Sequence, residues 1–217
     1  MPRKNLFPLA GRPLIAWTID AALQAPSLAR VIVSTDSEEI AEAASSLGVP
    51  VPFMRPESLA HDDTPGPQVI LHAIQWLERH GDVPDYVVML QPTSPLRTSG
   101  DIEAAIAIAR DTAADSVVSV CPCVHHPLWT KRIEDDGTMT DYLPNASQYP
   151  RRQDLPPAYA LNGALYLVRP QVLTRSGSFY GGRTFPYVMP YDRSIDIDTI
   201  EDMRMAEFLL TSPAPVD

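Results

Sequence analysis

Apolar residues along the chain follow two spacings in turn, one typical of amphipathic helices and one typical of buried strands. Helical spacing occurs at residues 14–23, 38–47, 67–77, 101–110 and 199–210. Short apolar runs between and after these helices predict strands at residues 31–35, 51–54, 86–90, 116–120, 162–168 and 186–189. This alternation predicts an α/β fold with a doubly wound, mostly parallel, Rossmann-like sheet. Ligands of such sheets bind beyond the carboxyl ends of the strands.

The alternation breaks at residues 121–158. This stretch is rich in Pro, Asp, Arg and Tyr, and a turn at Asp136-Gly137 separates two weakly alternating runs. We interpret it as a small excursion from the sheet. The sequence therefore predicts one α/β domain made of residues 1–120 and 159–212, with residues 121–158 inserted into it.

The composition is that of one compact domain. The chain has 217 residues, of which 45% are hydrophobic, which is enough for a single core. Its formal charge of -10, with only 17 Lys and Arg, argues against a general binder of nucleic acid or anionic membranes, because both need basic surface. The chain has no run of roughly 20 apolar residues and no apolar signal-peptide core. We expect a cytoplasmic protein with no membrane or nucleic-acid partner.

Segments far apart in the sequence carry side chains suited to nucleotidyl transfer. Lys4 can counter phosphate charge, and Asp196 and Asp198 alternate along an extended segment, which places both carboxylates on the same side. Mg²⁺ prefers a few carboxylate oxygens together with substrate phosphates, so the pair predicts a Mg²⁺ or Mn²⁺ site. The same pair is also compatible with a turn or a helix cap before residues 199–210. Gln91 directly follows a buried strand and can both donate and accept hydrogen bonds.

Motifs in a fixed order give the chain a family resemblance. They are P-R-K-N-L, L-A-G-R-P-L-I, V-S-T-D, R-P-x-x-L-A, Q-P-T-S-P-L-R, H-H-P, R-Q-x-L-P, N-G-A-x-Y and S-I-D-I-D. Together they resemble the acylneuraminate cytidylyltransferases, also called CMP-sialic acid synthetases, which couple CTP to a nine-carbon acid sugar. The resemblance extends from Met1 to about Leu210. It implies the fold of the nucleotide-diphospho-sugar transferases.

The resemblance also implies roles for individual residues. Lys4 is similar to the family's phosphate-contacting lysine, Arg55 to its cytidine-side arginine, and Asp196 and Asp198 to its metal carboxylates. The excursion is expected to insert into the twofold partner of a homodimer. Arg152 would then reach the partner's sugar pocket, where its planar guanidinium suits a carboxylate.

The resemblance assigns further residues to the sugar. Gln91 and Asn162 are similar to the family's acid-sugar contacts. Thr93 and Ser94 share the loop of Gln91 and are expected as polar neighbours of the sugar, although turn formation is the alternative role for all of these residues.

Three departures from the family pattern matter. The family has a strand and an A-R-x-x-S-K-G phosphate loop just before the position of Met1, and the loop cradles the triphosphate with backbone N–H groups. We expect the natural protein to start upstream, since otherwise the flanking strands must close up or another segment must fill the gap. Trp129 stands where sialic acid enzymes can carry a second basic residue, and Ala160-Leu161 replaces an Arg-Pro. Both changes favour a different nonulosonic acid, such as a legionaminic- or pseudaminic-type sugar, or another acidic acceptor.

The expected reaction is in-line attack of the anomeric hydroxyl of a 2-keto acid sugar on the α-phosphorus of CTP, with pyrophosphate leaving. The metal at Asp196 and Asp198 would bridge phosphates and Lys4 would counter their charge. Two alternatives stay open. One is a metal-dependent glycosyltransferase that uses the D-x-D pair, and the other is a dimeric scaffold that has lost activity with its phosphate loop.

Overall fold

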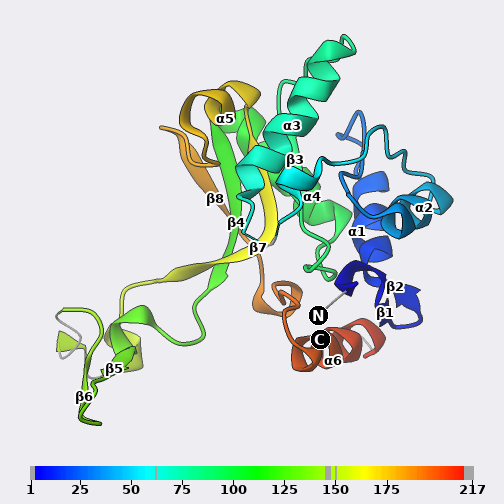
Figure 1. The fold of residues 1–217 in the computed structure, drawn as a ribbon. Coiled ribbons are helices and arrows are strands. Elements are labelled where there is room, and N and C mark those ends of the chain that lie inside the picture. Colours follow the sequence, from blue (N-terminus) through cyan, green and yellow to red (C-terminus); the bar gives the residue numbers. More distant parts are fainter. Residues whose placement is uncertain (1–2, 62, 145–147, 150, 213–217) are drawn as a thin grey trace.

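A four-stranded sheet forms the centre of the protein (Figure 1). The structure is a computed structural model that describes residues 3–61, 63–144, 148, 149 and 151–212. The strands lie in the order β3 (Val87–Leu90), β7 (Tyr159–Val168), β4 (Ser116–Pro122) and β8 (Thr184–Val188). β4 and β8 are parallel, whereas β7 is antiparallel to both of its neighbours. Three strands therefore run in one direction, as a mostly parallel sheet requires, and β7 makes the sheet mixed.

The excursion explains the direction of β7. β4 ends at Pro122, and the chain returns to the sheet at Tyr159, which faces Pro122 in the ladder. The chain thus re-enters the sheet at the same end where β4 left it. A strand that does so runs antiparallel to the strand beside it, as in a hairpin with a very long loop.

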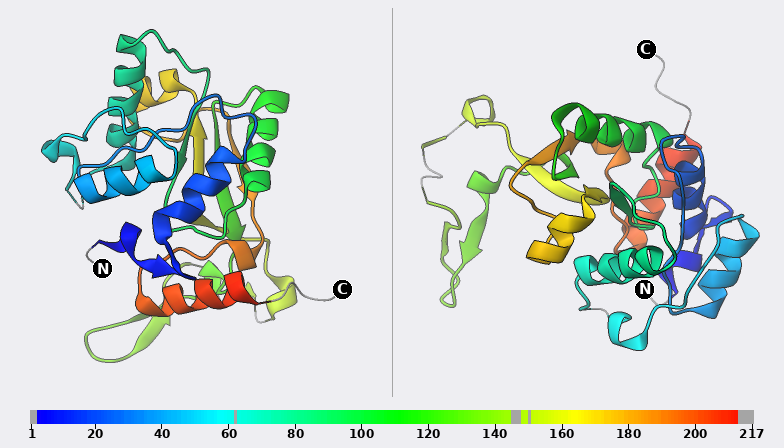
Figure 2. Two further views of the ribbon diagram at one scale, coloured as in Figure 1. Left: turned by 90° about the vertical axis from the view of Figure 1, so that its right-hand side faces the viewer. Right: turned by 90° about the horizontal axis from the view of Figure 1, so that it is seen from above.

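Helices cover both faces of the sheet (Figure 2). The covering helices are α1 (Leu14–Leu23) and α4 (Ser99–Thr112) on one face, and α3 (Gly66–Arg79) and α5 (Pro170–Ser176) on the other. Alternate residues of β7 divide between the two layers, because strand side chains alternate. Leu165 and Leu167 pack with α4 and α1, whereas Tyr166 and Val168 pack with α3 and α5. The expected helices are confirmed, with ends that differ by at most two residues.

The strands expected at residues 31–35 and 51–54 are wrong. The two segments run side by side next to α2 (Glu38–Ser46) but form only one parallel bridge, between Thr35 and Met54. Their apolar side chains pack against Ile15 and Ile19 of α1, which explains the hydrophobic pattern. A strand also needs a continuous ladder. Among the described residues, β3 pairs only with β7, so these segments and β3 do not close up on one another.

The N-terminal and C-terminal segments pack together at one end of the sheet. Two short strands, β1 (Pro8–Leu9) and β2 (Arg12–Pro13), pair with each other, and Leu9 packs against α6 (Ile200–Thr211). η1 (Lys4–Leu6) lies beside the same hairpin (Figure 1). This packing brings Lys4 next to the segment that precedes α6.

Residues 123–158 form an arm that projects from the sheet (Figures 1 and 2). The arm contains η3 (Pro127–Trp129), β5 (Lys131–Ile133), β6 (Met139–Asp141) and η5 (Arg152–Asp154). β5 and β6 pair antiparallel around the expected turn. Ile133 and Met139 face each other in the register and are 77% and 68% exposed. The arm therefore carries apolar side chains that the other described residues do not cover. The two-part domain division remains a prediction.

In the part of the chain that the structure describes, no helix is long and apolar enough to cross a membrane.

Candidate active site

A bulge in β7 brings two site residues together. Where β7 passes Ser119 of β4, the register shifts, and both the N–H and the C=O of Leu165 bond the Ser119 hydroxyl, at 2.8 and 3.1 Å. Gly163 lies in this bulge with φ +71. A β-carbon at Gly163 would lie 2.7 Å from Oε1 of Gln91 and 3.2 Å from Oδ2 of Asp196. Only glycine leaves room for both side chains and tolerates this backbone conformation without strain.

Lys4 contacts the carboxylate segment directly. Its ammonium donates to the Ile197 carbonyl at 2.7 Å and to Oδ1 of Asp198 at 3.1 Å. The two charged residues are 194 positions apart in the sequence. The predicted proximity of Lys4 and Asp198 is therefore present in the structure.

Asp196 and Asp198 are not the cap of the following helix. The cap of α6 is Thr199, which forms a capping box with Asp202. Asp202 also accepts the Asp198 N–H at 3.1 Å. Both carboxylates are thus free of the capping role that the sequence left open.

The environment of Asp196 disfavours the ionised form of its carboxyl group. Burial against the protein on one side raises the pKa of the Asp196 carboxyl, and the nearby Asp198 raises it further, while a hydrogen bond from Thr93 and the charge of Lys4 act in the opposite direction. Thr93 also accepts the Ile197 N–H on its backbone carbonyl at 2.8 Å. Thr93 therefore contacts the carboxylate segment, and its contact with a sugar stays a prediction.

The two carboxylates suit a divalent cation whose remaining ligands come from substrate phosphates. Two nearby carboxylates repel each other, and a bound cation removes this repulsion. Mg²⁺ binds one or two carboxylates together with substrate phosphates. Among the described residues, no group of three or more His, Cys, Asp or Glu side chains is placed to hold a metal ion. The donor set fits Mg²⁺ or Mn²⁺ bound with a nucleotide rather than an all-protein metal cage.

A buried arginine supports the loop of Gln91. Arg97 donates to the carbonyls of Gln91 at 3.2 Å and Ala164 at 2.7 Å, and to the Thr18 hydroxyl at 2.8 Å. Burial lowers the pKa of Arg97 to about 10, so the side chain still carries its charge at neutral pH. Arg97 ties the end of β3 to the bulge of β7 and thereby fixes the backbone of Gln91.

Gln91 opens onto a cavity of about 330 Å³. Its lining residues are Gly66, Pro67, Met89, Gln91, Tyr166, Gly177, Ser178, Phe179 and Tyr180. The aromatic wall of Tyr166, Phe179 and Tyr180 was missed by the sequence reasoning. Tyr166 closes the N-G-A-x-Y motif and could have been found, whereas Phe179 and Tyr180 follow a turn after α5 with no distinctive pattern.

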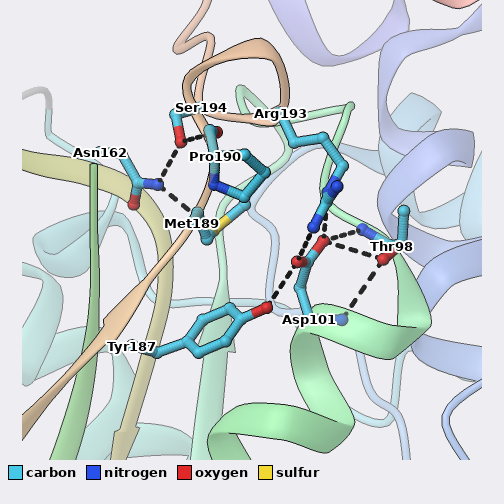
Figure 3. A network of polar contacts seen from close by, with 8 residues as sticks. All are labelled: Thr98, Asp101, Asn162, Tyr187, Met189, Pro190, Arg193 and Ser194. Carbon is cyan, nitrogen blue, oxygen red and sulfur yellow. Dashed lines mark hydrogen bonds and ion pairs between the residues drawn. The ribbon is translucent and has the colours of Figure 1, made fainter. Parts of the chain in front are cut away.

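Two predicted sugar contacts lie in the interior. Ser94 is 0% exposed, and its hydroxyl has no partner among the described residues. Asn162 is 4% exposed, and its amide donates to the Ser194 hydroxyl at 3.0 Å and to Sδ of Met189 at 3.2 Å (Figure 3). The structure gives Asn162 a supporting contact with the segment before Asp196, and contact with a sugar stays a prediction for both.

Arg55 lies at the carboxyl end of the 51–54 segment. It donates to Oδ1 of Asp36 at 2.7 Å. This hydrogen bond lowers the pKa of the Asp36 carboxyl. Thr35 accepts the Arg55 N–H at 2.8 Å, so backbone and side chain are both held. The nucleotide role of Arg55 stays a prediction.

Arg152 is separate from the residues around Gly163. It lies in η5 of the arm and lines a second cavity of about 570 Å³ at the base of the arm, together with residues such as His125, His126 and Trp129. This cavity and the cavity of Gln91 share no lining residue. Within one chain, the arm does not deliver Arg152 to the predicted sugar pocket.

Comparisons with known proteins identify the family of the chain. A cytidylyltransferase family model matches residues 1–212. The chain is 36% identical to the CMP-N,N'-diacetyllegionaminic acid synthase of Legionella pneumophila, with 97% of this chain and 90% of that protein covered. It is 34% identical to an N-acylneuraminate cytidylyltransferase of Streptococcus agalactiae, covering 93% of this chain and 48% of the relative, so it spans about half of that protein.

A solved structure shares the fold. The CMP:2-keto-3-deoxy-manno-octonic acid synthetase complexed with CTP has a TM-score of 0.68 and 19% identity, covering 97% of this chain and 92% of that chain. The likeness supports the α/β fold that the element order predicted and the nucleotide-diphospho-sugar transferase fold that the family resemblance implied. With its family model matched along almost the whole length, the chain belongs to the cytidylyltransferase family.

Proposed function

We propose that this protein transfers the cytidylyl group of CTP to the anomeric hydroxyl of a nonulosonic, sialic-type acid sugar and releases pyrophosphate. The observation that carries the proposal is the convergence of Gln91 and Asp196 over Gly163, with Lys4 bonded to Asp198 at the same end of the sheet. This end is where the strand order of an α/β sheet places ligands. The family match favours cytidylyl transfer over the glycosyltransferase alternative.

Each side chain has a distinct task in this reaction. Lys4 would exchange its contact with Asp198 for the phosphates of CTP, since an ammonium pairs with either anion. Asp196 and Asp198 would hold Mg²⁺ or Mn²⁺, which would neutralise charge that develops on the phosphates. Arg55 would contact the cytidine side, and Gln91 would orient the sugar by donating and accepting together.

The cavity of Gln91 supports a sugar of this class. One part of its wall is the Gln91 amide, suited to hydroxyl or carboxylate groups, and the other part is aromatic, suited to acyl and methyl groups. Sugars of the nonulosonic class carry both kinds of group. The named relatives differ in their acid sugar, and we leave the choice between sialic, legionaminic and related sugars to the assay.

We further propose that the protein acts as a homodimer in the cytoplasm. The support is the exposed apolar face of the β5–β6 hairpin and the distance of the arm from its own site (Figure 1). Arg152 would then serve the sugar pocket of the partner.

Pyrophosphate release tests the function. CTP and Mg²⁺ are supplied with a panel of nonulosonic acids to this chain, and to a version that carries before Met1 the strand and A-R-x-x-S-K-G loop implied by the family resemblance. We expect sugar-dependent release in at least the extended version. Two folded proteins that release no pyrophosphate with any sugar would contradict the proposal and favour the inactive scaffold. Hydrolysis of a sugar nucleotide instead would favour the glycosyltransferase.

A further inference from the structure

A buried carboxylate joins the start of α4 to the segment that carries Asp196 and Asp198 (Figure 3). Asp101 is only 2% exposed. Its oxygens accept from the Thr98 N–H and hydroxyl, both at 2.8 Å, and from the Tyr187 hydroxyl at 2.7 Å. Arg193 completes the set with two contacts, Nη2 to Oδ1 at 2.9 Å and Nε to Oδ2 at 3.2 Å.

The position of this pair in the chain is informative. Asp101 and Thr98 follow directly on the Gln91 loop, which ends at Arg97. Arg193 precedes Ser194, Asp196 and Asp198. The ion pair therefore closes a link between the two segments that carry the site, and the Arg193 guanidinium bonds Asp101 rather than Asp196 or Asp198.

Two further contacts hold the same segment. Asn162 bonds the Ser194 hydroxyl, which itself donates to the Pro190 carbonyl at 2.8 Å. Downstream of Asp196, the Ile197 N–H donates to the Thr93 carbonyl at 2.8 Å. Asp196 lies between these anchors, and only Ser194 and Ile195 separate it from Arg193.

We propose that Arg193 is a positioning residue, which through Asp101 sets the carboxylates of Asp196 and Asp198 for a nucleotide-bound divalent cation. The inference rests on the proposed function. An arginine fits the task because its two parallel hydrogen bonds fix direction as well as distance, whereas a lysine ammonium fixes distance alone. Outer residues that orient metal ligands typically contribute about 10- to 100-fold in metal affinity.

The test compares three substitutions that remove different contacts to Asp101. Arg193→Gln removes the ion pair, and Arg193→Lys keeps one charge contact. Tyr187→Phe removes one donor to Asp101 but leaves the pair with Arg193 intact. Arg30→Gln is the control, because it breaks an ion pair of similar length, 3.0 Å, with Asp82, and both of these side chains are exposed and lie outside the site. Thr98 and Tyr187 still satisfy Asp101 in both Arg193 variants, which favours correct folding.

The primary measurement is Mn²⁺ binding, followed by electron paramagnetic resonance in the presence of a non-hydrolysable CTP analogue. We expect Arg193→Gln to weaken Mn²⁺ binding about tenfold. Arg193→Lys should recover part of this loss, and Tyr187→Phe and Arg30→Gln should bind Mn²⁺ as the unaltered chain does. Thermal unfolding of each variant separates affinity from stability. With saturating Mg²⁺, the KM for CTP should change little in Arg193→Gln.

Three results would overturn the inference. The first is wild-type Mn²⁺ affinity in Arg193→Gln together with a lowered melting temperature, which indicates a purely structural pair. The second is an equal loss in Arg30→Gln. The third is an unaltered chain that binds no Mn²⁺ with the analogue. Failure of the proposed function itself is recognised separately, because it removes pyrophosphate release from the unaltered chain.

Discussion

The end of the sheet around Gly163 and the arm of residues 123–158 are built in opposite ways. Around Gly163, side chains from β3, β7 and the segment before α6 are fixed by buried hydrogen bonds and by one glycine that leaves them room. The arm has a two-stranded hairpin with exposed apolar residues, and its arginine faces a cavity of its own. The contrast teaches that the first region is held in place by contacts within its own chain, whereas the arm leaves apolar side chains that the described residues do not cover.

The largest expected difference between the two regions comes from removing the carboxylates of the site. Asp196→Asn or Asp198→Asn should lower kcat for pyrophosphate release at least about 10²-fold, because charge on the phosphates loses its metal-mediated stabilisation. The oligomeric state should not change, since the arm is untouched. Asp192→Asn, an exposed neighbour, is the control. Near-normal activity in both site variants would show that the metal is held elsewhere.

A glycine in each region tests how closely each is packed. Gly163→Ala should reduce activity about 10²-fold, because its β-carbon displaces Gln91 and Asp196 from productive positions. Gly137→Ala, at the tip of the arm, has φ +82 and nothing within 4 Å of the added carbon. It carries the backbone strain alone, about 1 kcal/mol. Equal effects on activity would mean that strain, rather than crowding at the site, is the cause.

The arm is tested by complementation between chains. Arg152→Ala should raise the KM for the sugar about tenfold, as expected for one charged hydrogen bond, and leave the KM for CTP unchanged. Mixing it with Asp196→Asn should restore activity, because one site of each mixed dimer then has both intact residues. No restoration in mixtures shown to exchange subunits would place Arg152 outside the partner's site. A chain that is monomeric in light scattering would refute the dimer itself.

The last prediction concerns stability rather than activity, and it fades at acid pH. Burial alone would raise the pKa of Asp101, but hydrogen bonds from Arg193, Thr98 and Tyr187 outweigh it and lower the pKa below 3.8. The ionised carboxylate therefore stabilises the fold at pH values above 3.8, and this contribution is lost as the pH falls through the lowered folded-state pKa. Asp101→Asn should cost about 2 kcal/mol at pH 7 and progressively less below pH 3.8. Urea unfolding at several pH values measures this, and a pH-independent difference would contradict it.

The sequence predicted the elements whose signals are local. Helices and central strands follow from residue spacing, and Lys4, Asp196 and Asp198 could be grouped because their chemistry is complementary. The segments at 31–35 and 51–54 were misassigned because apolar runs report burial and not ladder partners. The burial of Ser94 and Asn162 and the pairing of Asp101 with Arg193, 92 positions apart, depend on packing that no short pattern records.

Arg97 places a buried positive charge near the site, although the net charge of the chain is -10. Its guanidinium bonds only neutral oxygens, and the nearby Asp101 is already paired with Arg193, so the three side chains together retain one uncompensated positive charge. Water and salt do not reach this charge, because Arg97 is 2% exposed. Buried charges are screened far less than surface charges. The contribution of Arg97 to the local electrostatic potential should therefore persist at ionic strengths that screen the charges of surface lysines and arginines.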